Sequence, residues 1–196
     1  YSASKAAAEL VVASFRSSYF HLPGSPLLAT ARAGNVIGGG DWSEDRLIPD
    51  LVHAVKSGQS LEIRSPHATR PWQHVLECLS GYLMLGQCLL EGKSEFTDAW
   101  NFGPEPDSNR EVAGVLAELC KLWPQVTWHQ TNDQHPHEAN LLYLDSTKSK
   151  RSLGWRPVWN LSETLAATSD WYQSYLYDKE IATVRQLEVF TQAALQ

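Results

Sequence analysis

The chain has 196 residues, of which 43% are hydrophobic and 19% charged, a balance typical of a folded protein rather than a disordered one. Its net charge of −6 argues against a general nucleic-acid-binding surface. No apolar run approaches the roughly 18 residues that a membrane-spanning helix needs. We therefore expect neither nucleic acid nor a membrane as a partner.

The chain has three cysteines, Cys78, Cys88 and Cys120, an odd number without CxxC spacing. The first two fall in one predicted helix, where their separation places them about 15 Å apart. A disulfide needs Cα atoms within about 7 Å of each other, so these two cannot pair. Reduced thiols, and hence a cytoplasmic protein, are the expectation.

The N-terminal segment, residues 2 to about 20, predicts a helix that ends before a Pro-Gly breaker. Tyr1 stands four residues before Lys5, so the two side chains face one side of this helix. An ammonium group there lowers the pKa of a tyrosine, which must fall from about 10 to about 7 for the phenol to act as a base. By itself the pattern is equally typical of a surface helix turn. Because the pair opens a chain without an initiator methionine, we expect the chain to begin inside a longer protein.

The next segments alternate between strand and helix patterns. Residues 27–33 predict a short strand buried on both faces, as in a parallel sheet. Residues 35–45 predict a glycine-rich loop. Its Gly38-Gly39-Gly40 does not match the GxGxxG fingerprint, because the third glycine position falls on Ser43, so we favour a tight loop over a phosphate cradle. Residues 46–57 predict a helix that Gly58 ends.

The middle of the chain continues this alternation, with a strand at 61–63, a polar loop at 64–72, a helix at about 74–90 and a buried strand at 99–102. Ser108 and Glu111 have the spacing of a capping box and predict the start of the following helix.

The last third predicts strands at 126–129 and 141–144 around a polar loop at 132–140, and then a helix at 147–153. Asn160 is placed to cap a last long helix, and the tail at 179–196 is weakly helical and expected to be loosely held. Alternating strands and helices predict an α/β fold.

Three motifs occur in order along the chain: Tyr1-x-x-x-Lys5, the RAGNVIG segment at 32–38 and the RPWQHV segment at 70–75. Together they resemble the extended short-chain dehydrogenase/reductases that act on nucleotide sugars. Within that family, the segments GGGDW at 38–42, RLIPD at 46–50 and RSPHA at 64–68 are most similar to CDP-glucose 4,6-dehydratase. The resemblance runs from residue 1 to about residue 175.

The resemblance implies the C-terminal part of an NAD(P)-binding Rossmann fold plus a small mixed α/β substrate domain. Residues 1–45 are then the end of the Rossmann domain, and residues 72–103 its return helix and strand. Residues 46–71 and 104–178 form the nucleotide-sugar domain, and residues 179–196 a C-terminal tail. In the family, the glycine-rich half that binds NAD lies upstream.

The resemblance also implies a lyase reaction, in which CDP-glucose becomes CDP-4-keto-6-deoxyglucose and NAD is recycled internally. Tyr1 removes the proton of the 4-hydroxyl group while hydride passes to NAD, water leaves from the sixth carbon, and the hydride returns there. Lys5 holds the nicotinamide ribose, and Val36 lies beside the nicotinamide. Further acid and base residues precede the tyrosine in this family, so we expect the chain alone to be inactive.

Two segments match the family's phosphate contacts. Arg46, with Leu47 and Ile48, matches the segment that opens the substrate-domain helix, where backbone amides and a cation suit phosphate. Arg70 matches the arginine that grips the diphosphate, for which a guanidinium fork is well shaped.

The other matches are less specific. Asn35 matches an asparagine that contacts the sugar nucleotide, but alone it also suits a turn. Asn101 matches a second such asparagine, or is a buried side chain satisfied by backbone. Relatives often place an arginine where this chain has His135, and His137 or Glu138 then reads the nucleotide. The HxH spacing lacks a cysteine or acidic cluster to complete a metal site, so no metal is expected.

Family members feed deoxysugar synthesis for surface polysaccharides such as O-antigen, and usually pair through the Tyr-Lys helix. We therefore expect a homo-oligomer. Leu10, Val11 and Phe15 supply an apolar stripe for such a contact, although the same residues suit internal packing equally.

Two alternatives remain open at this point. A nucleotide-sugar epimerase of the same family shares Tyr1 and Lys5 but lacks the upstream acid/base pair, so the upstream sequence separates the two enzymes. A non-catalytic carbohydrate- or nucleotide-binding module would use Arg70 and the tryptophans. Titration with CDP-glucose and with simple sugars distinguishes the module from an enzyme.

Overall fold

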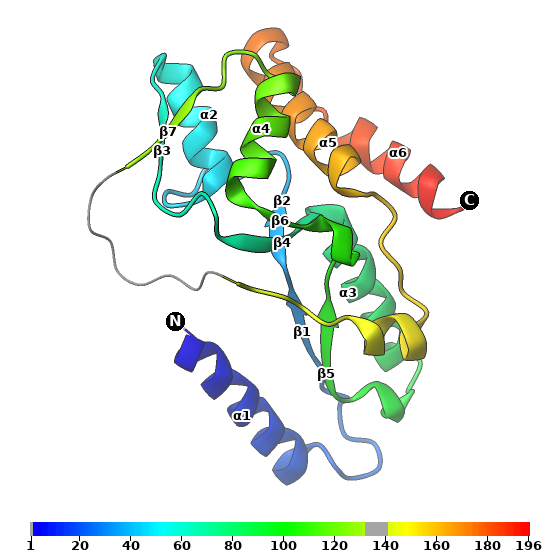
Figure 1. Ribbon diagram of the computed structural model, residues 1–196. Coiled ribbons are helices and arrows are strands. Elements are labelled where there is room, and N and C mark those ends of the chain that lie inside the picture. Colours follow the sequence, from blue (N-terminus) through cyan, green and yellow to red (C-terminus); the bar gives the residue numbers. More distant parts are fainter. Residues whose placement is uncertain (1, 132–140) are drawn as a thin grey trace.

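The computed structural model describes residues 2–131 and 141–196. Tyr1 and residues 132–140 lie outside the described residues, and with them His135, His137, Glu138 and the whole of the polar loop predicted at 132–140. The described chain is elongated (Figure 1). Toward one end lie α1 (Ser2–Tyr19), β1 (Thr30–Ala33), α3 (Val75–Leu90) and β5 (Ala99–Phe102), and toward the other lie α2 (Leu47–Ser57), β3 (Leu61–Ile63), α4 (Val112–Leu122) and α5 (Leu161–Gln173).

Two consecutive strands link these ends. β1 (Thr30–Ala33) pairs in parallel with β5 (Ala99–Phe102), and β2 (Asn35–Ile37) pairs in parallel with β4 (Thr69–His74). Gly34 lies between β1 and β2, where a Cβ atom would stand 2.4 Å from the Pro71 carbonyl oxygen. The absent side chain therefore lets the chain leave one sheet and enter the next. β4 also pairs antiparallel with β6 (Asn109–Glu111).

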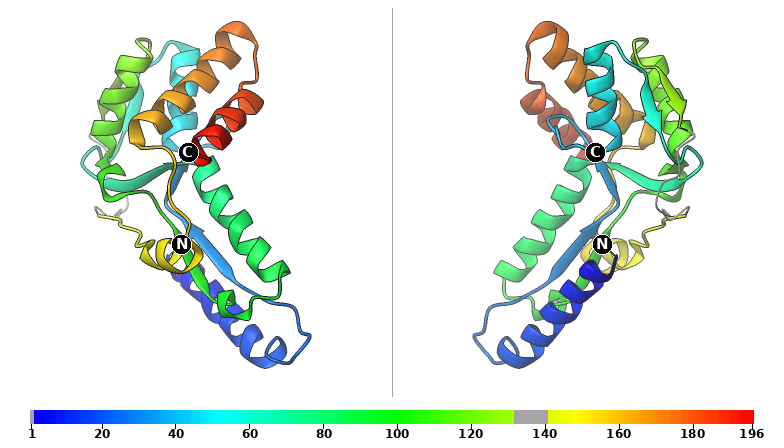
Figure 2. Two further views of the ribbon diagram at one scale, coloured as in Figure 1. Left: turned by 90° about the vertical axis from the view of Figure 1, so that its right-hand side faces the viewer. Right: turned by 90° about the vertical axis from the view of Figure 1, so that its left-hand side faces the viewer.

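Two helices cover the two faces of the β1–β5 pair, as the views in Figure 2 show. On one face, Glu9 of α1 (Ser2–Tyr19) accepts a hydrogen bond from the Thr30 hydroxyl at 2.8 Å. On the other, α3 (Val75–Leu90) packs its Cys78 and Leu85 in a cluster with Trp100, Phe102 and Trp155. α1 contributes no buried residue, and Glu9, Val12 and Arg16 are its half-buried positions.

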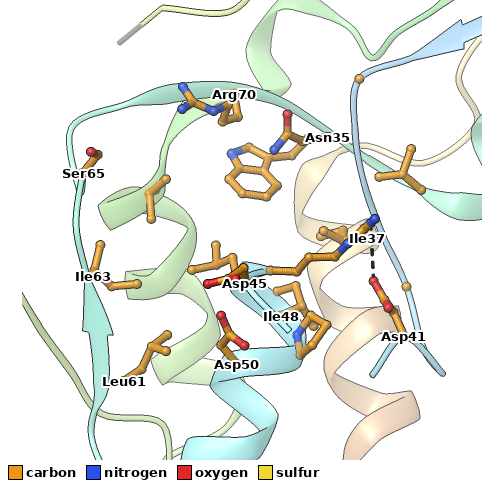
Figure 3. A pocket seen from close by; sticks show the side chains of 18 of the residues that line it. Asn35, Ile37, Asp41, Asp45, Ile48, Asp50, Leu61, Ile63, Ser65 and Arg70 are labelled. Carbon is orange, nitrogen blue, oxygen red and sulfur yellow. Dashed lines mark ion pairs between the residues drawn. The ribbon is translucent and has the colours of Figure 1, made fainter. Parts of the chain in front are cut away.

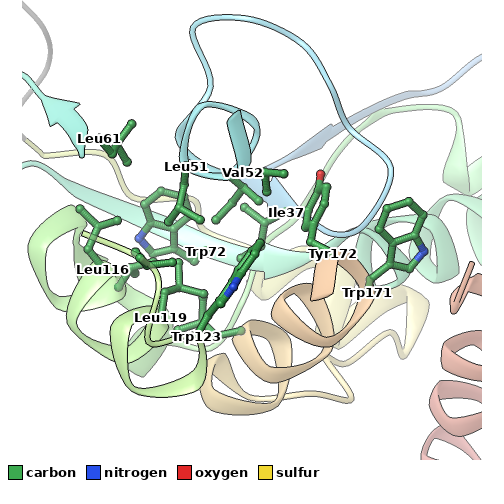
Figure 4. Packing of buried hydrophobic residues seen from close by; sticks show 14 of the residues in the cluster. Ile37, Leu51, Val52, Leu61, Trp72, Leu116, Leu119, Trp123, Trp171 and Tyr172 are labelled. Atoms are coloured by element: carbon green, nitrogen blue, oxygen red, sulfur yellow. The ribbon is translucent and has the colours of Figure 1, made fainter. Parts of the chain in front are cut away.

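The opposite end of the molecule has its own core. It is formed by α2 (Leu47–Ser57), α4 (Val112–Leu122), α5 (Leu161–Gln173) and the parallel pair of β3 (Leu61–Ile63) and β7 (Trp128–Gln130). Apolar side chains from every one of these elements meet β2 and β4 there (Figure 4). Fully or nearly fully buried members include Val52, Trp72, Leu116, Trp123 and Tyr172.

Short helical segments complete the fold. They are η1 (Ser94–Phe96), η2 (Pro106–Ser108), η3 (Ser149–Leu153) and η4 (Ser174–Asp178), followed by α6 (Thr183–Ala194). No helix in the described ranges is both long and apolar enough to cross a membrane.

Most predicted elements are confirmed. The helices near 2–20, 46–57 and 74–90 are present, Gly58 ends α2 with a positive φ of 65°, and Asn160 forms a full capping box with Glu163 at the start of α5. The strands at 61–63 and 99–102 are also confirmed, and the three cysteines are free thiols. The α/β fold is likewise confirmed.

Several predictions are wrong, chiefly where tertiary pairing recruits polar residues into strands. The glycine-rich loop begins with a strand, β2, and the polar loop at 64–72 contains most of β4. Glu111, not Ser108, is the N-cap residue of α4, and residues 109–111 form β6. β7 begins two residues later than predicted.

Three further expectations fail because of packing. Leu141 makes a single bridge to Thr69 rather than a strand. β1 spans only four residues, and two of them are exposed. The tail is not loosely held, because α6 buries Gln186 and Phe190, and the Phe190 ring packs edge-on against Trp159 with centroids 5.1 Å apart.

The contact between α3 and β5 leads to a prediction. A Cβ atom on Gly81 would lie 2.2 Å from the buried Phe102 ring, so Gly81→Ala is expected to destabilise the fold by about 2 kcal/mol. Gly86 lies on the same helix, and apart from its chain neighbours and the backbone of its own helix no atom of the described residues stands within 4 Å of the place that a methyl group would take there. Gly86→Ala is therefore expected to be neutral or stabilising by up to about 1 kcal/mol. Urea unfolding of both variants measures the difference, and equal effects would contradict this packing.

Candidate functional site

A cavity of about 780 Å³ opens where β2, the start of α2, β3 and the start of β4 converge (Figure 3). Six of the residues predicted to bind substrate or cofactor line it: Asn35, Val36, Arg46, Leu47, Ile48 and Arg70. These residues come from three elements that are far apart in sequence, so the fold brings them together.

The start of α2 forms one wall. Arg46 is the N-cap residue and has an extended backbone (φ −128°, ψ 136°), with no side-chain capping bond. The first-turn amides of a helix have no partners within the helix, and they attract anions. Arg46 also makes an ion pair with Asp41 at 3.7 Å, drawn as the dashed line in Figure 3.

Residues of α5 contact the loop that carries Asp41 and fix its position. The Tyr172 hydroxyl donates a 2.7 Å hydrogen bond to the Asp41 carbonyl oxygen, and burial raises the pKa of Tyr172 to about 12, so this group remains a donor. A Cβ atom on Gly39 would lie 2.0 Å from the Trp171 ring, which explains the glycine there. Trp42 packs against Tyr172 and Tyr175 with ring centroids 5.5 and 5.3 Å apart.

Arg70 forms the opposite wall. Its side chain leaves β4 beside Asn35, and the residue is 8% exposed. One guanidinium nitrogen donates to the Thr69 carbonyl at 2.9 Å, which restricts the orientation of the fork. Trp72, the next residue on this face of β4, is anchored by a 3.0 Å hydrogen bond from its indole to the Arg110 carbonyl. A buried guanidinium with a defined orientation suits a phosphate or carboxylate ligand.

Charged groups of both signs line the cavity: Asp41, Asp45, Asp50 and Glu62 with Arg46, Arg64 and Arg70. Burial opposes ionisation of Asp41, but hydrogen bonds from Ser43 and the charge of Arg46 hold its pKa below the usual value. Burial and the neighbouring Asp45 instead raise the pKa of Asp50. Asp45, Asp50 and Arg64 were missed as site residues, although all three lie in or beside the motifs at 46–50 and 64–68.

The remaining predicted site residues lie elsewhere. Lys5 is on the exposed side of α1 and Asn101 on β5, and neither is among the residues that line this cavity. The Asn101 amide donates to the Asp145 carbonyl at 2.9 Å, while its oxygen is buried without a partner among the described residues. Across residues 2–131 and 141–196, no group of three His, Cys, Asp or Glu side chains is placed to hold a metal ion.

The chain has the same fold as solved enzymes that act on nucleotide sugars. Solved structures similar to this chain include a UDP-glucuronic acid 4-epimerase from Bacillus cereus bound to UDP-glucuronic acid and NAD (TM-score 0.69, 20% identity, 85% of this chain and 50% of that one). A dTDP-glucose 4,6-dehydratase from Bacillus anthracis bound to NAD is also similar (TM-score 0.70, 20% identity, 90% and 52%). The fold is therefore that of about half of a Rossmann-fold short-chain dehydrogenase/reductase, as predicted.

The sequence comparison is more specific. The chain is 41% identical to the CDP-glucose 4,6-dehydratase of Salmonella typhimurium, over 96% of this chain and 54% of that protein. It is 27% identical to a dTDP-glucose 4,6-dehydratase of Xanthomonas campestris, over 88% and 48%. No protein-family model matches. The chain spans about half the length of these relatives, and its sequence is similar to nucleotide-sugar 4,6-dehydratases and to CDP-glucose 4,6-dehydratase in particular.

Proposed function

We propose that this chain is the C-terminal portion of an enzyme that converts CDP-glucose to CDP-4-keto-6-deoxyglucose. The observation that carries the proposal is the single cavity that joins Asn35, Arg46 and Arg70, in a chain 41% identical to a CDP-glucose 4,6-dehydratase. Arg70 and the first-turn amides of α2 supply hydrogen bonds and positive charge from two sides, which suits a diphosphate.

The nucleotide sugar would then extend along the cavity. Asn35 offers an amide to the sugar, and the backbone of Leu47 and Ile48 approaches the phosphates. His135, His137 and Glu138 are proposed to contact the nucleotide, and Asn101 the sugar, as in the family. These four assignments rest on the resemblance alone.

The nicotinamide ring of NAD fits the cavity beside Asn35. Half-buried Val36 lines the cavity there and offers an apolar contact for a flat ring. When bound, NAD would supply the hydride acceptor for the first step and the hydride donor for the last. Lys5 stabilises the phenolate form of Tyr1 and orients the ribose, and the Tyr1 phenolate takes the proton of the sugar 4-hydroxyl group and becomes a neutral phenol.

An unpaired strand edge and exposed apolar side chains at one end of the fold support the proposal that the chain is part of a longer enzyme. β1 pairs with β5 along one edge, and no strand in the described ranges pairs with its other edge. α1 exposes Leu10, Val11 and Phe15, which are 73%, 55% and 49% accessible. We propose that upstream sequence pairs with β1, and that a second copy packs on α1. The chain alone is expected to be inactive, and the complete enzyme to be cytoplasmic and to serve deoxysugar synthesis for surface polysaccharide.

The direct test incubates the full-length enzyme with CDP-glucose and NAD and follows the 4-keto product by its ultraviolet absorbance in alkali and by mass spectrometry. Loss of water from the sugar without net reduction of NAD is the expected result. Recovery of CDP-galactose would instead indicate an epimerase, a candidate favoured by the structural likeness to UDP-sugar 4-epimerases. Binding of simple glycans without any nucleotide dependence would favour a non-catalytic module.

Arg70 provides a quantitative prediction. Arg70→Lys is expected to raise the KM for CDP-glucose by about 10- to 100-fold, because an ammonium replaces a two-pronged contact to phosphate by a single point charge. Arg110 faces Arg70 in the β4–β6 register but does not line the cavity, so Arg110→Lys serves as the control. An unchanged KM in the Arg70 variant would remove Arg70 from the diphosphate site.

A further inference from the structure

Asp50 occupies an unexpected position for a cavity that binds a diphosphate. It lies in the first turn of α2, is half-buried, and lines the cavity. Figure 3 shows its carboxylate near that of Asp45, on the side of the cavity bounded by Leu61 and Ile63. Asp41 and Asp45 each have an arginine within 4 Å, Arg46 at 3.7 Å and Arg64 at 3.4 Å, whereas no ion pair joins Asp50 to a cation in the described part of the chain.

A diphosphate cannot be the group that Asp50 faces, because phosphate oxygens are acceptors and carry the same charge as the carboxylate. An acid in a first helical turn is favoured by the helix dipole, and the Asp45 backbone amide also favours the Asp50 carboxylate. These two effects are the structural alternative for Asp50. That alternative does not require the side chain to border a ligand cavity.

The neighbours of Asp50 indicate which part of a nucleotide sugar this side of the cavity suits. Ile48, Leu61 and Ile63 line the same space, and Ile48 and Leu61 are 4% and 7% exposed. Apolar side chains with a few placed polar groups are typical of sites for small organic ligands. A ring placed there must present a donor to the carboxylate. Cytosine carries an amino group at the position where uracil and thymine carry a carbonyl oxygen.

We propose that Asp50 is a specificity-determining residue, which selects cytosine over uracil and thymine by accepting a hydrogen bond from the exocyclic amino group of the base. The proposal rests on the proposed function, because it assumes that this cavity holds a nucleotide sugar. Arg64, paired with Asp45 beside it, supplies donors for the ring acceptors that cytosine presents along the same edge. A carbonyl oxygen in place of the amino group would face the Asp50 carboxylate without a proton between them.

The test measures base preference in the full-length enzyme. Dissociation constants for CDP and UDP are determined by calorimetric titration, and kcat/KM is determined for CDP-glucose and UDP-glucose. Asp50→Asn is expected to lower the preference for the cytidine ligand by about tenfold or more, since a hydrogen bond to a charged acceptor is lost and the new amide donates to a uracil carbonyl. Asp50→Glu keeps the carboxylate and is expected to keep the sign of the preference.

Glu44→Gln is the matched control, because it removes the same charge from the adjacent exposed loop and does not line the cavity. A preference that is equal in Asp50→Asn, Glu44→Gln and the wild type would overturn the proposal. Should Asp50→Asn fail to fold, Asp50→Ser is measured in its place, and failure of both to fold would assign Asp50 to the helix alone. If CDP preference depends on Asp50 while the wild type forms no 4-keto product, the proposed function fails and base selection stands.

Discussion

Replacing Tyr1 by phenylalanine in the full-length enzyme is expected to lower kcat for CDP-glucose by about 10³-fold. The substitution removes one hydroxyl group, and with it the only proposed acceptor of the 4-hydroxyl proton. Hydride cannot leave the sugar carbon without loss of that proton, so the first chemical step is blocked. The prediction rests on the Tyr-x-x-x-Lys motif, because Tyr1 lies outside the described residues.

The two kinetic constants separate a chemical role for Tyr1 from a structural one. The KM and the dissociation constant for CDP-glucose should change little, because the phosphate contacts of Arg70 and α2 are untouched. Tyr19→Phe provides the control, since Tyr19 lies near the other end of α1 and is 64% exposed. Turnover retained in the Tyr1 variant would remove the assignment of Tyr1 as the base.

The second large effect is expected at Glu77, and it concerns stability. Glu77 is 1% exposed, and its two carboxylate oxygens accept hydrogen bonds from the backbone N–H groups of Val158 at 2.9 Å and Trp159 at 2.7 Å. It thereby holds the segment that leads into the Asn160 cap of α5. Glu77→Ala leaves both donors without their partner, so we expect a loss of about 3 kcal/mol in the free energy of unfolding.

Chemical denaturation measures this loss, with Glu118→Ala as the control. Glu118 is an exposed acid on α4, whose 3.3 Å contact with Lys121 is a surface ion pair, and its removal should change stability by less than about 0.5 kcal/mol. Similar effects for the two variants would show that the Glu77 hydrogen bonds contribute no more than a surface contact.

Glu77 also produces a pH dependence of stability. Burial raises its pKa above the ordinary value of 4.5, and the two backbone hydrogen bonds only partly oppose this. The folded state therefore binds this proton more tightly than the unfolded state. The resulting stabilisation is fully present below about pH 4.5 and is lost as the pH rises through the higher folded value. The stability of wild type relative to Glu77→Gln should fall over that window, and a difference that rose with pH would contradict it.

The sequence predicted the helices well and the strands poorly, for a physical reason. α2 and α5 carry local signals. α2 has an apolar face and a C-terminal Gly58, and α5 begins with the Asn160–Glu163 capping box. β2 and β4 have no such signals, because Asn35, Arg70 and Gln73 are polar. Asn35 and Gln73 become strand residues by the pairing of β2 with β4, and Arg70 by the pairing of β4 with β6. The tail was misjudged likewise, since Phe190 is buried by Trp159, 31 positions earlier in the chain.

For the site, the residue types and their order could be predicted from the chain alone, because each of the motifs around Asn35, Arg46 and Arg70 is a contiguous segment and together they resemble one family. That these residues share a cavity, and that Asp45, Asp50 and Arg64 join them there, depends on tertiary folding. The charged residues of the cavity come from a loop, a helix and a strand. They become neighbours because Gly34 lets β2 leave the first sheet and pair with β4. No local sequence pattern encodes this close approach of two backbones.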